Sequence, residues 1–416
     1  MKLLKYLRNN ANFILNYLFV FYAFSIPLDL KIYRFIVIGI YIFFILQEDL
    51  KEKIKWILSN RFFHLFIIYI IYQFLVVLWT SDKNYGLRFV LKYIECFLPL
   101  FIITSSLKKE FVNKIINSWL LGMFITEIIA YGIYFNLWTT HYHNIHFDDI
   151  TPFYHHTIYS LFLSTSILIL LYKLLYEKWT IFHYLSLPFI LTMTINLFLT
   201  GGRGGQIAFF ITLFVVLFIK FRKNKKLLFI SILTPFLIFF IAYNFSSKFH
   251  NRINLAISDT KNIFENKNFC GSWGQRAGSY IVSKDIIKKS PLFGVGFHTP
   301  MDMLPVIVNE KYPYLKCIIH SQTIHLHNTF LMEITQAGII GLILLLSIFL
   351  YLFKLEIKDN FIRYVKLIFL INFIIYSMVD YSWHTAITMK YFAFFSAILI
   401  ATSTYHETNN IHQGTS

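Results

Sequence analysis

A histidine directly before a long apolar segment is the first candidate for chemistry in this sequence. His327 is followed by Asn328, a residue type that favours the N-cap of a helix, and by an apolar run from Phe330. The positive end of a helix dipole disfavours an imidazolium, so we expect a neutral base that can take a proton from a sugar hydroxyl. An interfacial histidine that only caps the helix explains the position equally well. His320 and His325 are close enough in sequence to be rivals for the same role.

Two arginines have the chemistry needed to bind phosphate. Arg203 stands among four glycines in TGGRGGQ, before an apolar segment, where backbone N–H groups and the next helix N-terminus favour an anion. The alternative is a tight turn between helices whose arginine meets lipid headgroups; the turn lacks the Gly-Lys-Ser/Thr ending of a Walker loop. Arg276 precedes an expected amphipathic helix over 277–290, which PLFGVGF at 291–297 closes with a turn. Spacing alone predicts a solvated arginine there, although a second guanidinium would suit a diphosphate.

Five further polar residues are candidates for substrate binding: Arg88, Lys92, His298, His325 and Asp380. Arg88 and Lys92 are one helical turn apart at the end of an apolar segment, where they can hold lipid phosphate or extend to headgroups. Asp380 follows another apolar segment, where it can line a cavity with Trp383 and His384 or form a structural ion pair with Lys390.

A histidine-rich connection raises the question of a metal site. The residues concerned are His141, His143, His146, Asp148, Asp149, His155 and His156. Their spacing fits no recognisable ligand pattern, and a polar loop explains them as well. We therefore predict neither a metal ion nor another cofactor.

The composition identifies the elements that must position these residues. Hydrophobic residues make up 57% of the 416 residues and charged residues only 14%, so the sequence predicts a polytopic membrane protein built of helices. Polar and basic breaks divide the chain into about twelve spans. They lie near 11–28, 31–47, 62–80, 87–104, 113–137, 156–176, 181–199, 205–221, 227–244, 328–353, 361–380 and 387–404.

The distribution of charge predicts the orientation of these spans. The formal net charge of +17 shows no basic stripe with interleaved aromatics, so nucleic acid is not an expected partner. With the N-terminus and an uncleaved first helix on the cytoplasmic side, the basic residues gather inside, as the positive-inside rule requires. We thus expect 1–244 to hold nine membrane helices and 328–416 three helices and a cytoplasmic tail. Between them, 245–327 is a loop with short helices outside the cytoplasm.

The three cysteines do not form a disulfide framework. Cys96 lies in an apolar segment. Cys270 and Cys317 share the large loop and can pair if that loop faces an oxidising compartment. The sequence leaves their pairing open.

Three motifs together resemble those of the O-antigen ligase and polymerase superfamily of bacterial envelope glycan enzymes. They are the arginine turn GGRGGQ, the loop sequence RAGSYIVSKDIIKKSPLFGVGF from Arg276, and HNTFLMEITQAGIIGL from His327. The resemblance implies a GT-C-like, inverting, metal-independent glycosyltransferase at the periplasmic face of the inner membrane. Arg203 and Arg276 would hold the donor diphosphate, and His327 would activate the acceptor hydroxyl. The turn departs from the family in being glycine-rich where serine or threonine is common.

Within this superfamily we expect an O-antigen ligase of lipopolysaccharide biosynthesis, embedded in membrane lipids. Its donor would be a glycan on undecaprenyl diphosphate and its acceptor the lipid A core. The closest alternative is the polymerase that joins lipid-linked repeat units, and a protein-glycosylating relative is more distant. A transporter of lipid-linked glycan or a non-catalytic scaffold would belong to other classes. Against transport, the cationic and histidine residues gather at one face and not at the bilayer midplane.

Overall fold

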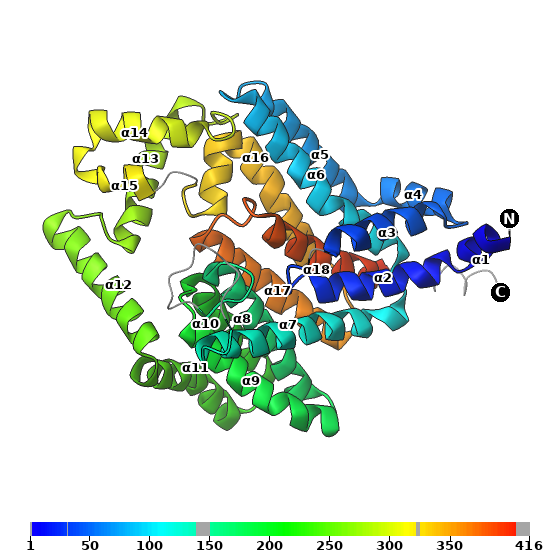
Figure 1. The fold of residues 1–416 in the computed structure, drawn as a ribbon. Coiled ribbons are helices and arrows are strands. Elements are labelled where there is room, and N and C mark those ends of the chain that lie inside the picture. The colour runs from blue at the N-terminus through cyan, green and yellow to red at the C-terminus, as the bar shows by residue number, and fades with distance from the viewer. Residues whose placement is uncertain (1, 31, 139–149, 322–324, 405–416) are drawn as a thin grey trace.

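Every regular element in the described part of the chain is a helix (Figure 1). The computed structural model describes residues 2–30, 32–138, 150–321 and 325–404. The elements are α1 (Lys2–Asn9), α2 (Ala11–Ser25), α3 (Tyr33–Ile45), α4 (Leu50–Ser59), α5 (Arg61–Val77), α6 (Lys83–Ser106), η1 (Lys109–Phe111), α7 (Val112–Tyr134), α8 (His156–Tyr176), α9 (Ile181–Leu199), α10 (Arg203–Phe221), α11 (Lys225–Phe245), α12 (Ser247–Asn266), α13 (Ser272–Lys289), α14 (Thr299–Lys311), η2 (Pro313–Leu315), α15 (Cys317–Ser321), α16 (Thr329–Lys354), α17 (Asn360–Val379) and α18 (Ala386–Thr404).

Each predicted span coincides with a helix, but fewer than twelve of these helices qualify as membrane spans. In the described ranges, eight segments are long and apolar enough: η1 with α7, then α8 to α11, and α16 to α18. The pair α4 and α5, bent by 74°, adds a ninth if it is one span. Helices α2 and α3 have only 15 and 13 residues, and charged residues interrupt α6. The chain is a multi-pass membrane protein, and the number twelve remains a prediction.

A buried polar cluster ties three of the central helices together. Asn372 of α17 accepts hydrogen bonds from Ser164 of α8 at 3.2 Å and from Thr212 of α10 at 2.8 Å. It also donates to Thr165 of α8 at 3.2 Å. A buried amide with its partners satisfied allows one arrangement of these helices and penalises others. The start of α10 therefore lies beside the end of α17.

The glycines around Arg203 allow this close packing. A Cβ on Gly202 or Gly205 would overlap Ser160 of α8, and one on Gly204 would lie 2.8 Å from Cγ2 of Val379 on α17. The sequence assigned these glycines to anion binding, whereas in the structure they let α10 approach its neighbours. As a result, Arg203 stands where three helices meet.

Helices α12 to α15 occupy the interval between α11 and α16, where the sequence predicted a loop with short helices. Figure 1 shows α12 running from α11 to the group formed by α13, α14 and α15. With 20 and 18 residues, α12 and α13 are not short. A disulfide joins Cys270 to Cys317, with their Cα atoms 5.2 Å apart, and so links the start of α13 to the start of α15.

Helix α16 is interrupted at Gly338, whose φ of 68° lies in the left-handed region. Segment 291–296, the predicted turn after α13, lies against this interruption. Four backbone hydrogen bonds of 2.9–3.4 Å join it to residues 335–340. They satisfy backbone groups that the break would leave unpaired, a requirement for irregular backbone within an apolar helix. The layer containing α13 and α14 is thus fastened to α16, the helix that follows His327.

Candidate active site

A small polar pocket lies where α8, α10, α12, α13 and the end of α17 meet. Three arginines line it, Arg203, Arg252 and Arg276, together with the carboxylate of Asp380. The other lining residues are His156, Thr157, Gly201, Gly204, Ser272, Tyr376 and Val379. The pocket therefore brings together the two arginines that the sequence selected and adds a third that it did not.

Arg203 and Arg276 converge on one serine. The Oγ atom of Ser272 accepts from Nη1 of Arg203 at 3.3 Å and from Nη1 of Arg276 at 3.1 Å. Arg276 lies in the second turn of α13 and not before the helix as predicted, because α13 begins at Ser272. The carboxylate of Asp259 on α12 accepts the N–H of Trp273 at 3.1 Å and caps that earlier start.

Among the described residues, no carboxylate forms an ion pair with either guanidinium group. Nε of Arg276 is buried without a hydrogen-bond partner in the described part of the chain. Burial lowers the pKa of Arg276, and the nearby Asp380 opposes that change. Two like charges on a shared neutral oxygen, with a buried donor left over, form an arrangement that a multivalent anion would complete.

His327 is held in an uncommon backbone conformation directly before α16. Its φ of 51° is in the left-handed region, which costs a non-glycine residue about 1–2 kcal/mol. Asn328 is the N-cap, as predicted: its Oδ1 accepts from the N–H of Leu331 at 2.9 Å. Its Nδ2 donates to the carbonyl of Met378 at 2.9 Å and to the hydroxyl of Tyr280. The cap thus joins α16 to α17 and α13, and it fixes the residue before it.

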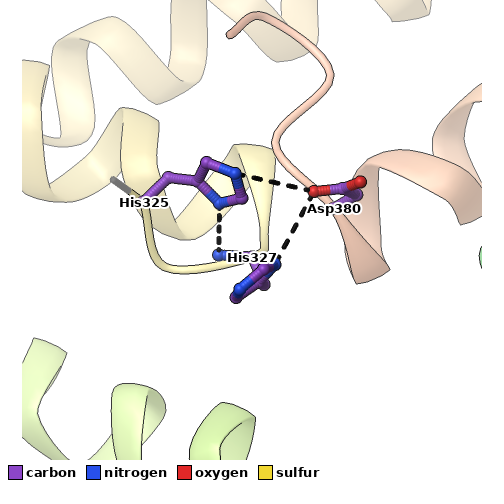
Figure 2. A group of neighbouring side chains, drawn as sticks. All are labelled: His325, His327 and Asp380. Atoms are coloured by element: carbon purple, nitrogen blue, oxygen red, sulfur yellow. Dashed lines mark hydrogen bonds and ion pairs between the residues drawn. The ribbon is translucent and has the colours of Figure 1, made fainter. Parts of the chain in front are cut away.

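The resulting geometry brings two histidines to one carboxylate (Figure 2). Nδ1 of His327 lies 3.7 Å from Oδ1 of Asp380, and Nε2 of His325 lies 4.0 Å from the same oxygen. The backbone N–H of His327 donates to Nδ1 of His325 at 3.2 Å. Because Nδ1 of His325 accepts, the proton of the neutral ring must be on Nε2 and face Asp380.

The two histidines therefore differ in what they can do. Nδ1 of His325 accepts the N–H of His327, its Nε2 lies toward Asp380, and burial lowers its pKa to about 3. His327 directs Nδ1 toward Asp380, and its side chain is 32% exposed against 16% for His325. Nε2 of His327 is thus the better placed atom to receive a proton from a ligand.

Asp380 connects this pair to the arginine pocket, which it also lines. Its Oδ1 accepts from the N–H of Tyr381 at 2.8 Å and its Oδ2 from the hydroxyl of Tyr376 at 3.2 Å. Burial by itself would raise the pKa of Asp380, but His327, His325 and the N–H of Tyr381 outweigh it and hold the pKa well below its usual range. Lys390, the alternative ion-pair partner, lies over the ring of Tyr33 instead.

Part of the chain that carries these residues matches a known protein family. Residues 188–346 match the family model described as O-antigen ligase. The chain carries an O-antigen ligase family domain. This family covers ligases and polymerases, whose members are membrane enzymes of glycosyl transfer acting on lipid-linked glycans. No curated protein matches the chain closely enough to count as a relative.

The O-antigen ligase domain contains Arg203, Arg276, His325 and His327, which confirms the resemblance on which the sequence interpretation relied. Asp380 lies outside the matched residues, in the connection from α17 to α18. The carboxylate that faces the domain's histidine is therefore supplied by a later part of the chain.

The remaining predicted substrate-binding residues lie at different distances from this centre. His384 lies beside His325, with the two rings tilted and their centroids 5.3 Å apart, and its backbone carbonyl accepts from Nζ of Lys92 at 2.6 Å. His298 begins α14 with a positive φ and lies against Tyr85 of α6, at 4.9 Å between centroids. Arg88 is exposed and donates within its own helix, to Asn84. Lys92 and His298 therefore border the site, and Arg88 does not join it.

The two histidines and Asp380 also have the composition of a metal site. His325, His327 and Asp380 each offer one ligand atom, and these atoms lie within 4.8 Å of one another. The histidine-rich connection behaves differently: His141, His143, His146, Asp148 and Asp149 lie outside the described residues, and His156 lines the arginine pocket.

The sequence interpretation missed three residues of this O-antigen ligase domain that contribute to the candidate site. They are Arg252, the shared acceptor Ser272 and Tyr280 behind the Asn328 cap. All three lie on α12 or α13, whose docking depends on contacts distant in sequence. A basic residue one helical turn from an aromatic anchor, Arg252 after Phe249, is the only signal that the sequence offered.

Proposed function

We propose that this protein is an O-antigen ligase, which transfers a glycan from undecaprenyl diphosphate to the lipid A core at the periplasmic face of the inner membrane. The observation that carries the proposal is the position of Asp380. It lines the pocket of arginines and also lies 3.7 Å from His327. A diphosphate bound by the arginines would therefore sit beside a histidine able to accept a proton.

The arginines suit the donor. Undecaprenyl diphosphate is already a good leaving group, so neutralising its phosphates supplies much of the stabilisation that the transition state needs. Arg203 and Arg276 approach from different helices, and planar guanidinium groups can bind phosphate oxygens in pairs. When the anion binds, Ser272 would lose its hydrogen bonds from the two arginines and would lie beside the anion.

His327 suits the acceptor. A hydroxyl oxygen of the core sugar attacks the anomeric carbon of the glycan, and Nε2 of His327 takes the hydroxyl proton. The bond between the anomeric carbon and the phosphate oxygen breaks, with inversion at that carbon. Undecaprenyl diphosphate leaves with its charge held by Arg203 and Arg276. Asp380 orients His327 and stabilises the imidazolium that forms.

The hydrogen bonding of His325 supports a reaction without a metal ion. A metal would need the lone pair of Nε2, but that atom carries the ring proton while Nδ1 accepts the N–H of His327. In the described structure His325 therefore presents a ring N–H, and not a lone pair, on its side toward Asp380, whose Oδ1 lies 4.0 Å away. Activity in the presence of a chelator is the corresponding expectation.

Two features support a periplasmic site. Among the short connections, those predicted to lie on the opposite side of the membrane hold most of the basic residues, as the positive-inside rule requires of cytoplasmic connections. The Cys270–Cys317 disulfide lies in the layer that covers the site, and disulfides persist in oxidising compartments.

The test is transfer by purified protein in EDTA, with undecaprenyl-diphosphate glycan as donor and lipid A core as acceptor. We expect transfer by the wild type and its loss in Arg203→Ala, Arg276→Ala and His327→Ala. Arg88→Ala, which changes an exposed arginine away from the pocket, is the matched control and should retain activity. Movement of the lipid-linked glycan across a vesicle membrane without glycan transfer would refute the proposal that the protein is an enzyme.

The polymerase is the second candidate, because the family match covers both activities. It would use the same donor site and the same base, with a second lipid-linked glycan as acceptor. Elongation of the lipid-linked glycan by the purified protein, with the lipid A core ignored, would identify a polymerase and replace the ligase proposal.

A further inference from the structure

The pocket lined by Arg203 and Arg276 is also lined by a third arginine. Arg252 lines it from α12, on the side of Arg203. The positive charges of Arg252 and Arg276 both repel that of Arg203, and the repulsion from Arg252 is the larger. Within the described ranges, the side chain of Arg252 makes no hydrogen bond or ion pair with another residue.

The position of Arg252 is fixed by the first turns of α12. Ser246 caps this helix by accepting the N–H of Phe249 at 3.2 Å, and its hydroxyl donates to the carbonyl of Phe198 at 2.8 Å. The ring of Phe249 is buried against Phe198 and Phe239, with centroids 5.0 and 5.4 Å away. Residues three apart share a helix face, so Arg252 lies on the same face of α12 as Phe249, toward the end of α9 and the start of α10.

The charges around the pocket do not balance. Among the described residues that line it, Asp380 is the only carboxylate, and Asp380 already receives two hydrogen bonds and faces two histidines. Asp259, which also acts on Arg203, is occupied in capping α13. Nε of Arg276 is buried without a partner. Three guanidinium groups directed at one small space need an anion with more charge and more acceptor oxygens than one phosphate provides.

We propose that Arg252 is a third ligand of the donor's diphosphate, and that it makes the pocket select a diphosphate over a monophosphate. Arg203 and Arg276 share Ser272, whereas Arg252 reaches the pocket from a separate helix and supplies a separate guanidinium fork. The choice of an isoprenoid diphosphate as the ligand rests on the proposed function. The predicted selectivity rests on the number and placement of the arginines.

The test is direct binding to purified full-length protein, with geranylgeranyl diphosphate and geranylgeranyl monophosphate as probes at one ionic strength. For Arg252→Ala we expect the dissociation constant of the diphosphate to rise about 10- to 100-fold, as for a lost charge-assisted contact, with a smaller rise for the monophosphate. Arg252→Lys should recover part of the loss. Lys261→Ala, which changes an exposed lysine of α12 paired with Glu265 at 3.9 Å, is the matched control.

Thermal unfolding of each variant shows whether it is folded, and Arg252→Gln serves if the alanine variant is not. An unchanged dissociation constant for the diphosphate, or an equal rise for both probes, would overturn the proposal. Failure of the proposed function gives a different pattern, in which the wild type binds the diphosphate through Arg252 and transfers no glycan.

Discussion

The two histidines that flank Leu326 face one carboxylate but differ in which ring nitrogen is available to accept a proton. His325 accepts the N–H of His327 at Nδ1, so its ring proton is on Nε2, toward Asp380, and no lone pair is left to take a proton from a substrate. His327 approaches Asp380 through Nδ1 and leaves Nε2 available. At the scale of single residues, position in a hydrogen-bond chain separates a base from the group that supports it.

This difference predicts the effects of substitution. His327→Ala should lower kcat by about 10²- to 10⁴-fold, the usual contribution of a general base. His325→Asn should lower kcat much less, because the amide oxygen can replace Nδ1 as acceptor of the His327 N–H. Initial rates at saturating donor measure both. Equal inactivation by the two substitutions would contradict this division of roles between His327 and His325.

Acid should destabilise the site before it affects most of the protein. Burial lowers the pKa of His325 to about 3 and that of His384 to about 4, whereas histidine in an unfolded chain titrates near 6.5. Between about pH 6.5 and about pH 4 the unfolded chain binds more protons, so the free energy of unfolding falls as the pH falls. The apparent Tm should decrease across this window, and less steeply in His384→Gln. Identical slopes for the two proteins would contradict this assignment.

At the scale of elements, the site depends on a helix that is not continuous. The break of α16 at Gly338 receives segment 291–296, and both partners use glycines with positive φ, Gly294 and Gly338. A Cβ on Gly338 would overlap the carbonyl of Leu292, and one on Gly294 would overlap Gln336. The layer that carries Arg276 is therefore held to the helix that follows His327 by two positions that tolerate no side chain.

Gly338→Ala should reduce stability by about 1–3 kcal/mol, because overlap and left-handed backbone both oppose it. It should also reduce kcat, since the layer bearing Arg276 loses its fixed place relative to His327. Thermal unfolding and transfer rates measure the two effects. Gly39→Ala is the control: its Cβ would meet only the flexible tip of Leu18 at 3.3 Å, at an ordinary φ. Wild-type behaviour of both variants would refute the account of the break.

At the scale of the whole molecule, the site is assembled from widely separated stretches. Arg203 begins α10, Arg276 lies in α13, His327 precedes α16 and Asp380 follows α17. The Cys270–Cys317 disulfide spans 47 residues between two of these stretches. It limits how far the start of α13, with Ser272 and Arg276, can move from the segment that leads to His327.

Removing this disulfide should lower stability by roughly 3–4 kcal/mol, the loop-closure contribution expected for a loop of this size. It should also raise the KM for the donor, because Arg276 loses its tether. The double variant Cys270→Ser/Cys317→Ser and reductant-treated wild type should show the same decrease in Tm. A reductant effect that persists in the double variant would trace the change to Cys96 or to the solvent instead.

Local sequence signals predicted the parts of this structure that short-range physics determines. Apolar runs located every helix that is long and apolar enough to span a membrane, and Asn328 is the cap that its residue type indicated. Arg203 and Arg276, both selected from the sequence, line one pocket. A membrane span needs only composition and length, and a cap needs only its neighbours.

What the sequence did not predict depends on partners far along the chain. The early start of α13 is fixed by Asp259, the break in α16 is completed by residues 291–296, and Arg252 acquires its role when α12 folds back. Asp380 was predicted to bind substrate, and its position 3.7 Å from Nδ1 of His327 was not part of that prediction. None of these pairings has a signature within a short window of residues.

The fastening of segment 291–296 to α16 has a consequence for how the protein is made. Chains are synthesised from the N-terminus, so this segment is made before Gly338 exists to receive it. Its backbone groups must wait in water until α16 has entered the membrane and opened at its glycine. Maturation of the site is therefore a late step in biogenesis, and a chain arrested before α16 would have its arginines without the means to arrange them.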